Sequence, residues 1–345
     1  MHILNVMLGR GGGGIESAFA DYATMLLAEG HQVTNCIAPG AFIEKYLPTK
    51  AEKVTLVQGS QFDPSAVWKA GKLLRSVKPQ VVITHGKRAF QIFSLARKLF
   101  ARDVKLVNVL HRHRYKGLKS ADRIITVSRT IREEAIDSGV AEQKLVYIPN
   151  ALMHVPDAKP EALREVPVIG VLGRFVPEKG VDIFLEALAM LKICKVSFKV
   201  RIAGEGALKS ELKELAAKLG VADHIEWLGW VDDLPAFYRS IDVFCLPSRA
   251  ESFGIAVLAA MAYAKPVVST RTLGPSEVLL HTRNALLCNI EAEPLAKALA
   301  EILAVPHRAL QLAEAARETA LTFRAELVSK QLSDCLKDVV NGAAG

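Results

Sequence analysis

Residues 242–270 of this 345-residue chain read DVFCLPSRAESFGIAVLAAMAYAKPVVST. A short apolar run ends in a polar loop, an apolar segment of helical length follows, and a second β-rich run closes the stretch. Strand, helix and strand in such close succession form a βαβ unit, which places the two strands parallel in one sheet. Glu251 is the single carboxylate between Asp242 and Glu277. It lies at the N-terminal end of the predicted apolar helix, so its role depends on what that helix end faces.

The same alternation of β-rich runs and amphipathic segments extends through both halves of the chain. The runs are HILNVML, HQVTNCI, KVTLV, QVVITH, KLVNVL and RIITVS in the first half, and VIGVLG, SFKVRIAG, HIEWLG, DVFCLP and KPVVST in the second. They predict an α/β protein with two Rossmann-like, doubly wound parallel sheets. A proline-rich stretch at 147–167 separates the halves, so we predict one domain at 1–150 and another at 151–324. Ligands of such sheets bind at the carboxyl ends of the strands, which predicts a substrate cleft between the domains.

Composition excludes several classes of protein. The chain is 50% hydrophobic and 23% charged, which is typical of a globular protein with a large core. Its five cysteines are scattered singly, which favours reduced core thiols over disulfides or a zinc site. The N-terminus lacks a basic leader, and no apolar run approaches the roughly 20 residues of a spanning helix. We therefore expect a cytoplasmic protein without a metal, and the net charge of +8 suggests an anionic partner.

A glycine-rich turn, LGRGGGGIES at 8–17, follows the first predicted strand and opens a helix. Glycines there let a phosphate or sugar approach the helix N-terminus. Gly9, Gly11 and Gly14 also satisfy G-x-G-x-x-G, the dinucleotide-binding pattern. That pattern needs an acid near the end of the second strand to hold a ribose, and HQVTNCIAPGAF offers none. The alternative interpretation of these glycines is a flexible turn that binds no ligand.

Four motifs in the second half each follow a predicted strand: GRFVPEKG, AGEGALKSEL, PSRAESFGI and LGPSEVL. In the first of them, Arg174 and Lys179 lie on one loop. Two such cations can clamp a diphosphate, the guanidinium as a fork and the ammonium as a mobile point charge. A departing nucleoside diphosphate needs this clamp because negative charge builds on it as its bond breaks. Solvated loop charges are the alternative interpretation.

Together these motifs resemble the GT-B glycosyltransferases, and more narrowly the retaining family 4 group, which transfers a sugar from a nucleotide diphosphate donor. The resemblance covers nearly the whole chain. It rests on Gly13 and Gly14, G-R-F-x-x-x-K-G at 173–180, A-G-E-G at 203–206, I-P-N at 148–150, P-S-x-x-E-S-F-G at 247–254 and G-P-x-E at 274–277.

The resemblance implies a set of site residues. Arg174 and Lys179 would bind the donor diphosphate, Glu251 would hold hydroxyls of the transferred sugar, and the amides from Ser252 to Ile255 would face the sugar and phosphates. The remaining residues implied to contact the donor are Gly13, Gly14, Gly204, Glu205, Phe253, Gly254 and Glu277. The last helix, about 325–345, would cross back to pack on the first domain.

Two positions depart from the family pattern. By the resemblance, the predicted apolar helix at Glu251 usually bears two glutamates eight residues apart, which is near a whole number of turns and so puts them on the same face, and the second one holds the nucleotide ribose. Here that residue is Ala259, and the hinge has Ala151 where glycine is usual. Three interpretations of Ala259 stay open. Another side chain binds the ribose, or the donor is bound in a different way, or the protein no longer transfers sugar.

Two histidines follow predicted strands of the first half, His85 in ITHGKR and His111 in VLHRHRYKG. The resemblance favours His111, which would hydrogen-bond the reacting sugar and stabilise charge rather than act as a nucleophile. Without the resemblance, a surface histidine among arginines is the more common reading. No carboxylate pair flanks the expected anomeric centre as a double-displacement glycosidase requires. The family instead implies retention, with the leaving diphosphate helping to deprotonate the acceptor.

Segment 87–123 is strongly basic, with Asp103 and Asp122 as its only acids. Its cations are Lys87, Arg88, Arg97, Lys98, Arg102, Lys105, Arg112, Arg114, Lys116, Lys119 and Arg123, and the apolar residues among them are Phe90, Ile92, Phe93, Leu95, Leu99 and Phe100. One interpretation is peripheral binding to an anionic membrane that carries a lipid-linked or phosphorylated acceptor. The other is that the apolar face packs on the sheet while the charges are solvated. The chain shows no nucleic-acid-binding module.

These observations predict a retaining glycosyltransferase that moves a hexose-type sugar from a UDP-sugar to a glycan or lipid-linked acceptor, in lipopolysaccharide or polysaccharide biosynthesis at the cytoplasmic face. UDP is preferred only because it is frequent in the family. Two alternatives stay open. A nucleotide-sugar isomerase of the same fold would need no acceptor, and a donor-binding protein would bind the nucleotide sugar without transfer or hydrolysis.

Overall fold

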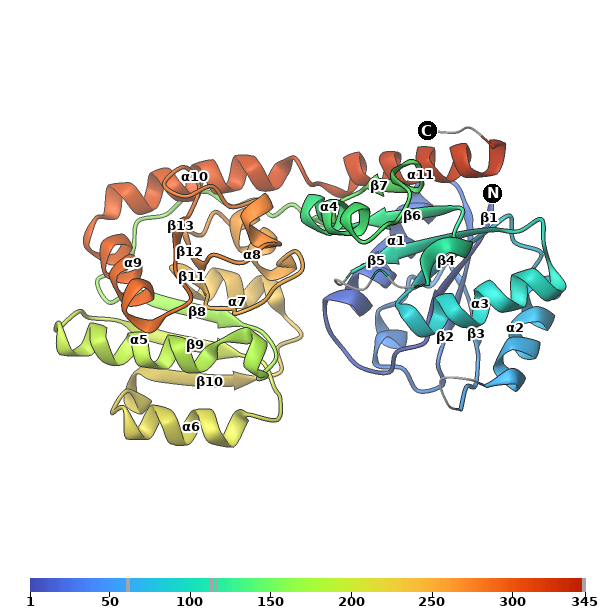
Figure 1. Cartoon of the computed structure of the whole chain (residues 1–345). Helices are drawn as coiled ribbons and strands as arrows, with labels where there is room; N and C mark the ends of the chain where they lie inside the picture. Colours follow the sequence, from blue (N-terminus) through green and yellow to red (C-terminus); the bar gives the residue numbers. More distant parts are fainter. Residues whose placement is uncertain (60–62, 112–114, 116, 343–345) are drawn as a thin grey trace. The chain divides into compact units, whose positions relative to one another are not determined.

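The computed structural model describes residues 1–59, 63–111, 115 and 117–342, and the chain divides into two compact units (Figure 1). Unit 1 comprises Met1–Met153 and Phe323–Gly345, and unit 2 comprises His154–Thr322. Arg112, Arg114 and Lys116 of the basic segment, and residues 343–345 of the last predicted helix, lie outside the described residues. No helix in the described ranges combines the length and apolar character needed to cross a membrane.

Unit 1 is built on a seven-stranded sheet with the order β3-β2-β1-β4-β5-β6-β7. Every neighbouring pair is parallel. Its strands are β1 (His2–Met7), β2 (Gln32–Ile37), β3 (Glu52–Thr55), β4 (Val81–His85), β5 (Lys105–Leu110), β6 (Arg123–Thr126) and β7 (Leu145–Tyr147). Its helices are α1 (Gly14–Ala28), α2 (Pro64–Val77), α3 (Lys87–Phe100), α4 (Arg129–Asp137) and α11 (Ala325–Asn341).

Unit 2 is built on a six-stranded parallel sheet with the order β10-β9-β8-β11-β12-β13. Its strands are β8 (Val168–Leu172), β9 (Lys199–Ala203), β10 (Ile225–Gly229), β11 (Val243–Leu246), β12 (Val267–Thr270) and β13 (Leu286–Cys288). Its helices are α5 (Val181–Ile193), α6 (Lys209–Lys218), α7 (Leu234–Ser240), α8 (Ile255–Ala262), α9 (Ala292–Ala304) and α10 (Pro306–Leu321), with short 3₁₀ turns η4 (Pro177–Lys179) and η6 (Pro275–Glu277). Both sheets therefore confirm the predicted pair of parallel, doubly wound sheets.

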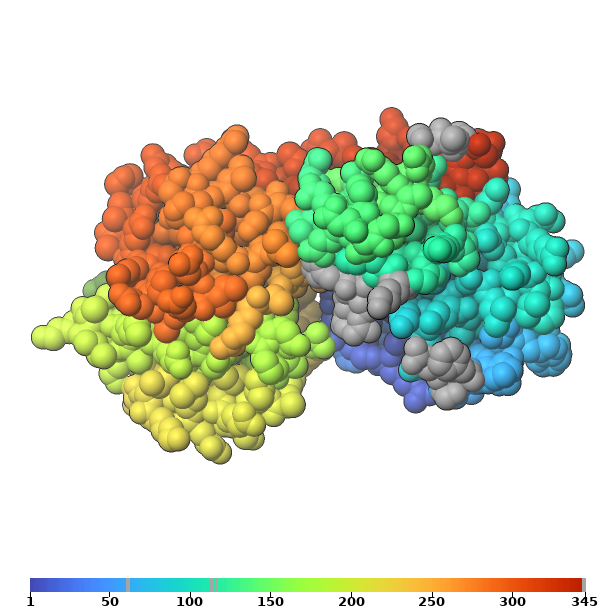
Figure 2. Space-filling view, in the orientation of Figure 1, coloured from blue at the N-terminus to red at the C-terminus, as the bar shows by residue number. Residues whose placement is uncertain are grey.

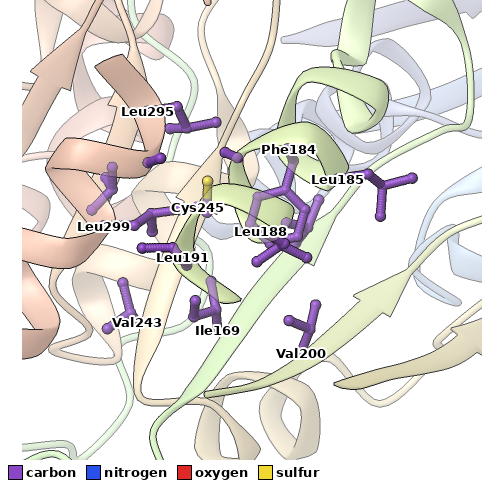
Figure 3. Packing of buried hydrophobic residues seen from close by; sticks show 14 of the residues in the cluster. Ile169, Phe184, Leu185, Leu188, Leu191, Val200, Val243, Cys245, Leu295 and Leu299 are labelled. Carbon is purple, nitrogen blue, oxygen red and sulfur yellow. The ribbon is translucent and has the colours of Figure 1, made fainter. Parts of the chain in front are cut away.

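The core of unit 2 shows why its strands contain so few polar residues. Phe184, Leu188 and Leu191 of α5 lie against Ile169 of β8 and Val243 of β11 in one buried cluster (Figure 3). Helix α5 also packs against α6 and α9, while α8 packs against α10. A parallel strand covered by helices on both faces needs apolar side chains at nearly every position. That requirement explains the continuous runs VIGVL and VFCL.

Local signals in the sequence fix several helix ends. Asp63 caps α2, and its Oδ1 accepts hydrogen bonds from the amides of Ser65 (2.9 Å) and Ala66 (3.3 Å). Pro64 occupies the first helical position, where its missing N–H costs nothing. Ser128 caps α4 in the same way, through the amide of Ile131 at 3.1 Å. These caps set where the helices begin after each strand.

Helix α11 packs on α1 within unit 1. His31 Nε2 lies 2.8 Å from the hydroxyl of Ser333, and the Ser329 hydroxyl donates to Glu29 at 2.7 Å. At the start of α11, Leu152 donates to Phe323 O (2.7 Å) and accepts from the amide of Ala325 (3.0 Å). The preceding Ala151 is buried and is not among the described residues with positive φ, so alanine fits this hinge position without backbone strain.

Three features differ from the sequence-based expectations. The edge strands β7 and β13 were not predicted, because three residues are too few to establish a period. Cys194, expected in the core with the other cysteines, is exposed at the C-terminal cap of α5. The lone acid Glu251 lies in the loop before α8, since Gly254 caps a helix that begins only at Ile255. Glu251 and Ala259 therefore do not share a helix face.

Candidate active site

Four loops of unit 2 leave the carboxyl ends of adjacent strands. They are residues 173–180 after β8, 204–208 after β9, 247–254 after β11 and 271–277 after β12. All four emerge at one edge because the strands are parallel. Connections run in opposite directions from the β8 and β11 pair, so this pair is the topological switch point, where doubly wound sheets bind ligands. The motifs singled out in the sequence occupy these four loops.

Lys179 and Glu251 meet at this switch point. Lys179 ends the turn η4 after β8, and its ammonium forms an ion pair with the carboxylate of Glu251. The side chains are 21% and 16% exposed, so the pair is shielded from bulk water yet remains within reach of a ligand. Arg174, on the same loop as Lys179, is exposed. The structure thus brings together a cation suited to phosphate and a carboxylate suited to sugar hydroxyls.

Arg249, which the sequence reasoning missed, joins the two loops. Its guanidinium contacts both carboxylate oxygens of Asp182 at 2.7 and 2.5 Å, and its Nη1 donates to Pro177 O at 3.0 Å. The amides of Arg249 and Ala250 both donate to Glu178 O, at 2.8 and 3.2 Å. A bidentate fork fixes direction as well as distance. Arg249 therefore holds the loop of Glu251 against the loop of Lys179.

Glycine allows these loops to approach each other. Gly180 has φ +61°, and a Cβ there would overlap the carbonyl oxygen of Pro247. A Cβ at Gly274 would overlap the carbonyl group of Ser252, and the Gly274 amide donates to Glu251 O at 3.3 Å. The P-S-x-x-E-S-F-G loop is thus enclosed by backbone on two sides, which restricts where the Glu251 side chain can point.

Helix α8 presents its N-terminus to the same edge. Gly254 caps it with φ +88°, and the first-turn residues Ile255 and Ala256 are half-buried. The amides of a helix's first turn have no partner within the helix, and they favour negative charge. Ser252 is half-buried beside them, whereas Phe253 is buried. Ala259 lies one turn further along and is also half-buried, so its methyl group stands where the family's second glutamate would be.

The A-G-E-G turn supports the neighbouring loop. A Cβ at Gly204 would overlap the Gly173 carbonyl, and one at Gly206 would overlap the backbone of Phe175. The Glu205 carbonyl accepts from the Phe175 amide at 2.9 Å, while the Glu205 carboxylate pairs with Lys209 at 2.6 Å. Packing alone explains both glycines. In η6, Glu277 follows Pro275 on the loop that encloses Ser252.

In unit 1 the switch point lies between β1 and β4, and the glycine-rich turn follows β1. Gly13 is extended (φ 169°) and Gly14 begins α1. A Cβ at Gly12 would come within 2.7 Å of the Phe42 ring, whereas one at Gly9 would lie 3.4 Å from Glu16 Oε1. The carboxylate of Glu16 therefore already occupies the neighbourhood of this helix end. A negative charge at this position is unfavourable for a phosphate at the same helix end.

His85 ends β4, and His111 directly follows β5. Both are buried, and His85 Nδ1 lies 2.9 Å from His111 Nε2. His85 Nε2 lies 3.0 Å from Oδ1 of Asn5, on β1. The two histidines considered as alternatives in the sequence thus form one hydrogen-bonded chain, and Asn5 is a further member that no sequence motif indicated.

Helix α3 buries one apolar face in unit 1 and leaves two further apolar side chains exposed. Phe90, Ile92 and Phe93 are buried against the rest of unit 1, whereas Leu95 and Leu99 are 47% and 59% exposed. Arg88, Lys98 and Arg102 are exposed near these two leucines. Arg97 instead forms an ion pair with Asp122 and donates hydrogen bonds to two backbone carbonyls. In the space-filling view, α2 and α3 lie in the light-blue to cyan part of the surface of unit 1 (Figure 2).

Within the described residues, no group of three or more His, Cys, Asp or Glu side chains is arranged to hold a metal ion. Unit 2 taken by itself has an ion pair beside the N-terminus of α8, and unit 1 taken by itself has a buried polar chain.

Two family models together match nearly the whole chain. Glycosyltransferase Family 4 matches residues 12–152, and Glycosyl transferases group 1 matches residues 157–319. The chain belongs to the family 4 glycosyltransferases. This retaining family has the GT-B fold, which accounts for the two Rossmann-like sheets. The identification as a glycosyltransferase, predicted from the motifs, is confirmed.

Known proteins resemble this chain over different spans. LpsE of Rhizobium meliloti (strain 1021), a lipopolysaccharide core biosynthesis glycosyltransferase, is 28% identical over 319 residues, covering 89% of this chain and 90% of LpsE. A GDP-mannose-dependent alpha-(1-6)-phosphatidylinositol monomannoside mannosyltransferase of Mycobacterium tuberculosis is 32% identical over 186 residues, 51% of this chain and 48% of that protein. HepE of Anabaena, solved with UDP and glucose, superposes with a TM-score of 0.86 at 20% identity, covering 98% of this chain and all of HepE.

Proposed function

We propose that this glycosyltransferase moves a hexose-type sugar from a UDP-sugar to a glycan or lipid-linked acceptor of lipopolysaccharide or polysaccharide biosynthesis, at the cytoplasmic face of a membrane. Unit 2 holds the donor in this proposal, and unit 1 supplies the acceptor side. The ion pair of Lys179 and Glu251 at the switch point of unit 2 is the observation on which the proposal depends most.

The pair supplies the two kinds of contact that a sugar diphosphate needs. Lys179, with Arg174 on the same loop, neutralises the diphosphate, whose charge grows as the glycosidic bond breaks. Glu251 accepts hydrogen bonds from sugar hydroxyls. The amides at the start of α8 add partial positive charge on the same edge of the sheet. With the reacting groups positioned, these charges stabilise the separation of an oxocarbenium-like sugar from its leaving group.

The choice of UDP is supported by a likeness of fold alone, because HepE was solved with UDP and glucose. The mycobacterial relative is named as GDP-mannose-dependent, so GDP-sugars are the competing donors. LpsE and the mycobacterial enzyme act in lipopolysaccharide core and phosphatidylinositol mannoside synthesis, which supports a glycan or lipid-linked acceptor.

Peripheral membrane binding through α3 is part of the proposal. Leu95 and Leu99 project from the same helix as Arg88 and Lys98, and Arg102 follows shortly after its end. Exposed apolar side chains among cations are suited to the interface of an anionic bilayer. A lipid-linked acceptor would be reached from such a surface.

Calorimetric titration with UDP-, GDP- and ADP-sugars tests the donor, followed by an assay of the best binder for slow hydrolysis. Micromolar binding of one donor with slow hydrolysis, both lost in Arg174→Ala and Glu251→Ala, supports the proposal. Conversion of the donor to an epimer without acceptor would instead show an isomerase. Tight binding with neither hydrolysis nor transfer would show a binding protein, and no binding at millimolar concentration would contradict the donor site.

A further inference from the structure

A chain of buried polar side chains crosses the central strands of unit 1. Asn35 on β2, Asn5 on β1 and His85 on β4 are 1%, 0% and 1% exposed, and His111 after β5 is 7% exposed. Successive members are joined by hydrogen bonds of 3.1, 3.0 and 2.9 Å. Buried polar groups cost free energy unless they are satisfied, so a chain of four across a core calls for a physical reason.

The backbone carbonyl of Phe19 fixes the direction of this chain. Asn5 Nδ2 lies 3.0 Å from Phe19 O, which can only accept, so the amide nitrogen must face it. The other Nδ2 hydrogen is directed to Asn35 Oδ1 at 3.1 Å. Asn5 Oδ1 is therefore the atom that faces His85, and because it bears no hydrogen, His85 Nε2 must be the donor.

His85 then determines the protonation of His111. A neutral imidazole with its hydrogen on Nε2 has a lone pair on Nδ1. Burial lowers the pKa of His85 well below its usual value, with the charge of His111 as a second cause, so His85 stays neutral. Its ring is also packed edge-on against Phe19 and Tyr22. His85 Nδ1 thus accepts, and His111 Nε2 donates to it.

We propose that His85 is a positioning residue that fixes His111 in the tautomer with its hydrogen on Nε2, which makes Nδ1 of His111 the atom that accepts a hydrogen bond or proton from the substrate. His111 keeps its Nε2 hydrogen whether it is neutral or charged, so only Nδ1 exchanges a proton. The inference rests on the proposed function in one respect, the contact between His111 and the substrate.

The tautomer can be measured without any transfer assay. In protein labelled with ¹⁵N-histidine, long-range proton–nitrogen correlations distinguish protonated from unprotonated ring nitrogens. Signals are assigned by their loss in His111→Gln and His85→Leu. We expect the shared proton on His111 Nε2, with His111 Nδ1 unprotonated and shifted on addition of the nucleotide sugar. A proton on His85 Nδ1 instead, or a nucleotide-dependent shift confined to other histidines, would overturn the proposal.

Kinetics test the consequence. His85→Leu removes the acceptor and is expected to lower kcat about tenfold or more with little change in the KM for donor, while His85→Gln, whose amide oxygen can accept, restores part of the loss. Thr84→Val is the matched control, since Thr84 is equally buried on β4 but bonds to Val107 O and Asn108. If His85→Leu and Thr84→Val lower kcat equally, His85 is merely structural. If the native protein transfers no sugar, the proposed function fails, whereas the labelling result still decides the tautomer.

Discussion

The ammonium of Lys179 and the carboxylate of Glu251 form an ion pair that links the loops after β8 and β11. Each group is suited to a different part of a sugar diphosphate. In the proposed donor complex, a bound donor would exchange this contact for two new ones, from Lys179 to phosphate oxygens and from Glu251 to sugar hydroxyls. The loops themselves are held by Arg249 and Asp182, so the exchange needs only side-chain movement.

The exchange predicts that removing the charge of Glu251 changes the affinities for UDP and for the UDP-sugar in different ways. In Glu251→Gln, Lys179 no longer has an anionic partner, so we expect UDP to bind as tightly as in the parent or up to about tenfold more tightly. The UDP-sugar should bind more weakly, and transfer should be lost. Calorimetry with both ligands measures the difference. Glu293→Gln on α9 is the control, because Glu293 pairs with Lys297 on the surface of the same unit. An equal loss of affinity for UDP and UDP-sugar would contradict the exchange.

Gly180→Ala tests the contact between the two loops. Gly180 (φ +61°) and Gly220 (φ +67°) have similar backbone conformations, but only at Gly180 would a Cβ overlap a backbone carbonyl. At Gly220 the nearest atom to a Cβ is the ammonium of Lys192, at 3.8 Å. We expect Gly220→Ala to cost about 1–2 kcal/mol of unfolding free energy, from the backbone conformation alone. Gly180→Ala should cost more and should weaken donor binding. Urea unfolding of both variants measures these costs. Equal costs would show that the two loops move apart to accommodate the added methyl group without a further loss of stability.

Most of the fold could be predicted from local pattern, whereas the site partners could not. Runs such as VVITH and KLVNVL identify buried parallel strands by themselves. Lys179 and Glu251 are 72 positions apart, and they meet because β8 and β11 are neighbours, which no local pattern reveals. The same holds for His85, His111 and Asn5, on or directly after three adjacent strands of unit 1. The position of Glu251 before α8 depends on the left-handed Gly254, and nothing in the apolar run that follows indicates this.

Ala259→Glu restores the carboxylate that family 4 usually has on this helix. Ala259 is half-buried on α8, so a glutamate there reaches solvent at the edge of the site. If it holds the donor ribose, affinity for the nucleotide sugar should rise by on the order of 1 kcal/mol, which is about fivefold. Ala217→Glu, exposed on α6, controls for the added charge. Unchanged or weaker affinity in Ala259→Glu alone would mean that another group already occupies the ribose position.

Helix α3 predicts binding to anionic vesicles. Replacing both Leu95 and Leu99 by serine removes exposed apolar surface, and Lys98→Glu reverses one charge among them. Since each cation near an anionic surface contributes about 1 kcal/mol, the charge reversal should lower vesicle affinity roughly tenfold or more. Co-sedimentation with phosphatidylserine and phosphatidylcholine vesicles measures it, with Lys213→Glu on α6 as the control. Equal loss in both charge reversals would point to net charge rather than to α3.

Asp21 on α1 makes the stability of the protein depend on pH. Burial raises the pKa of its carboxyl from the ordinary 3.8 to about 7. The folded state thus holds this proton more tightly than the unfolded state does, so the stabilisation is complete below pH 4 and is lost as the pH rises to 7. Asp21→Asn has no such proton. Its unfolding free energy should equal that of the parent near pH 4 and exceed it at pH 8 by roughly 1–4 kcal/mol.

Urea unfolding from pH 4 to 8 measures the difference in unfolding free energy between the parent and Asp21→Asn. The contributions of other titrating groups cancel in this difference. Asp63→Asn is the control, because hydrogen bonds from the Gly59 amide and from Ser65 hold the pKa of Asp63 near 2. Its contribution is present above the ordinary carboxyl range and is lost only as the pH falls towards 2, so its difference from the parent should stay constant between pH 5 and 8. A constant difference for Asp21→Asn as well would mean that the Asp21 carboxyl is ionised in the folded protein throughout this range.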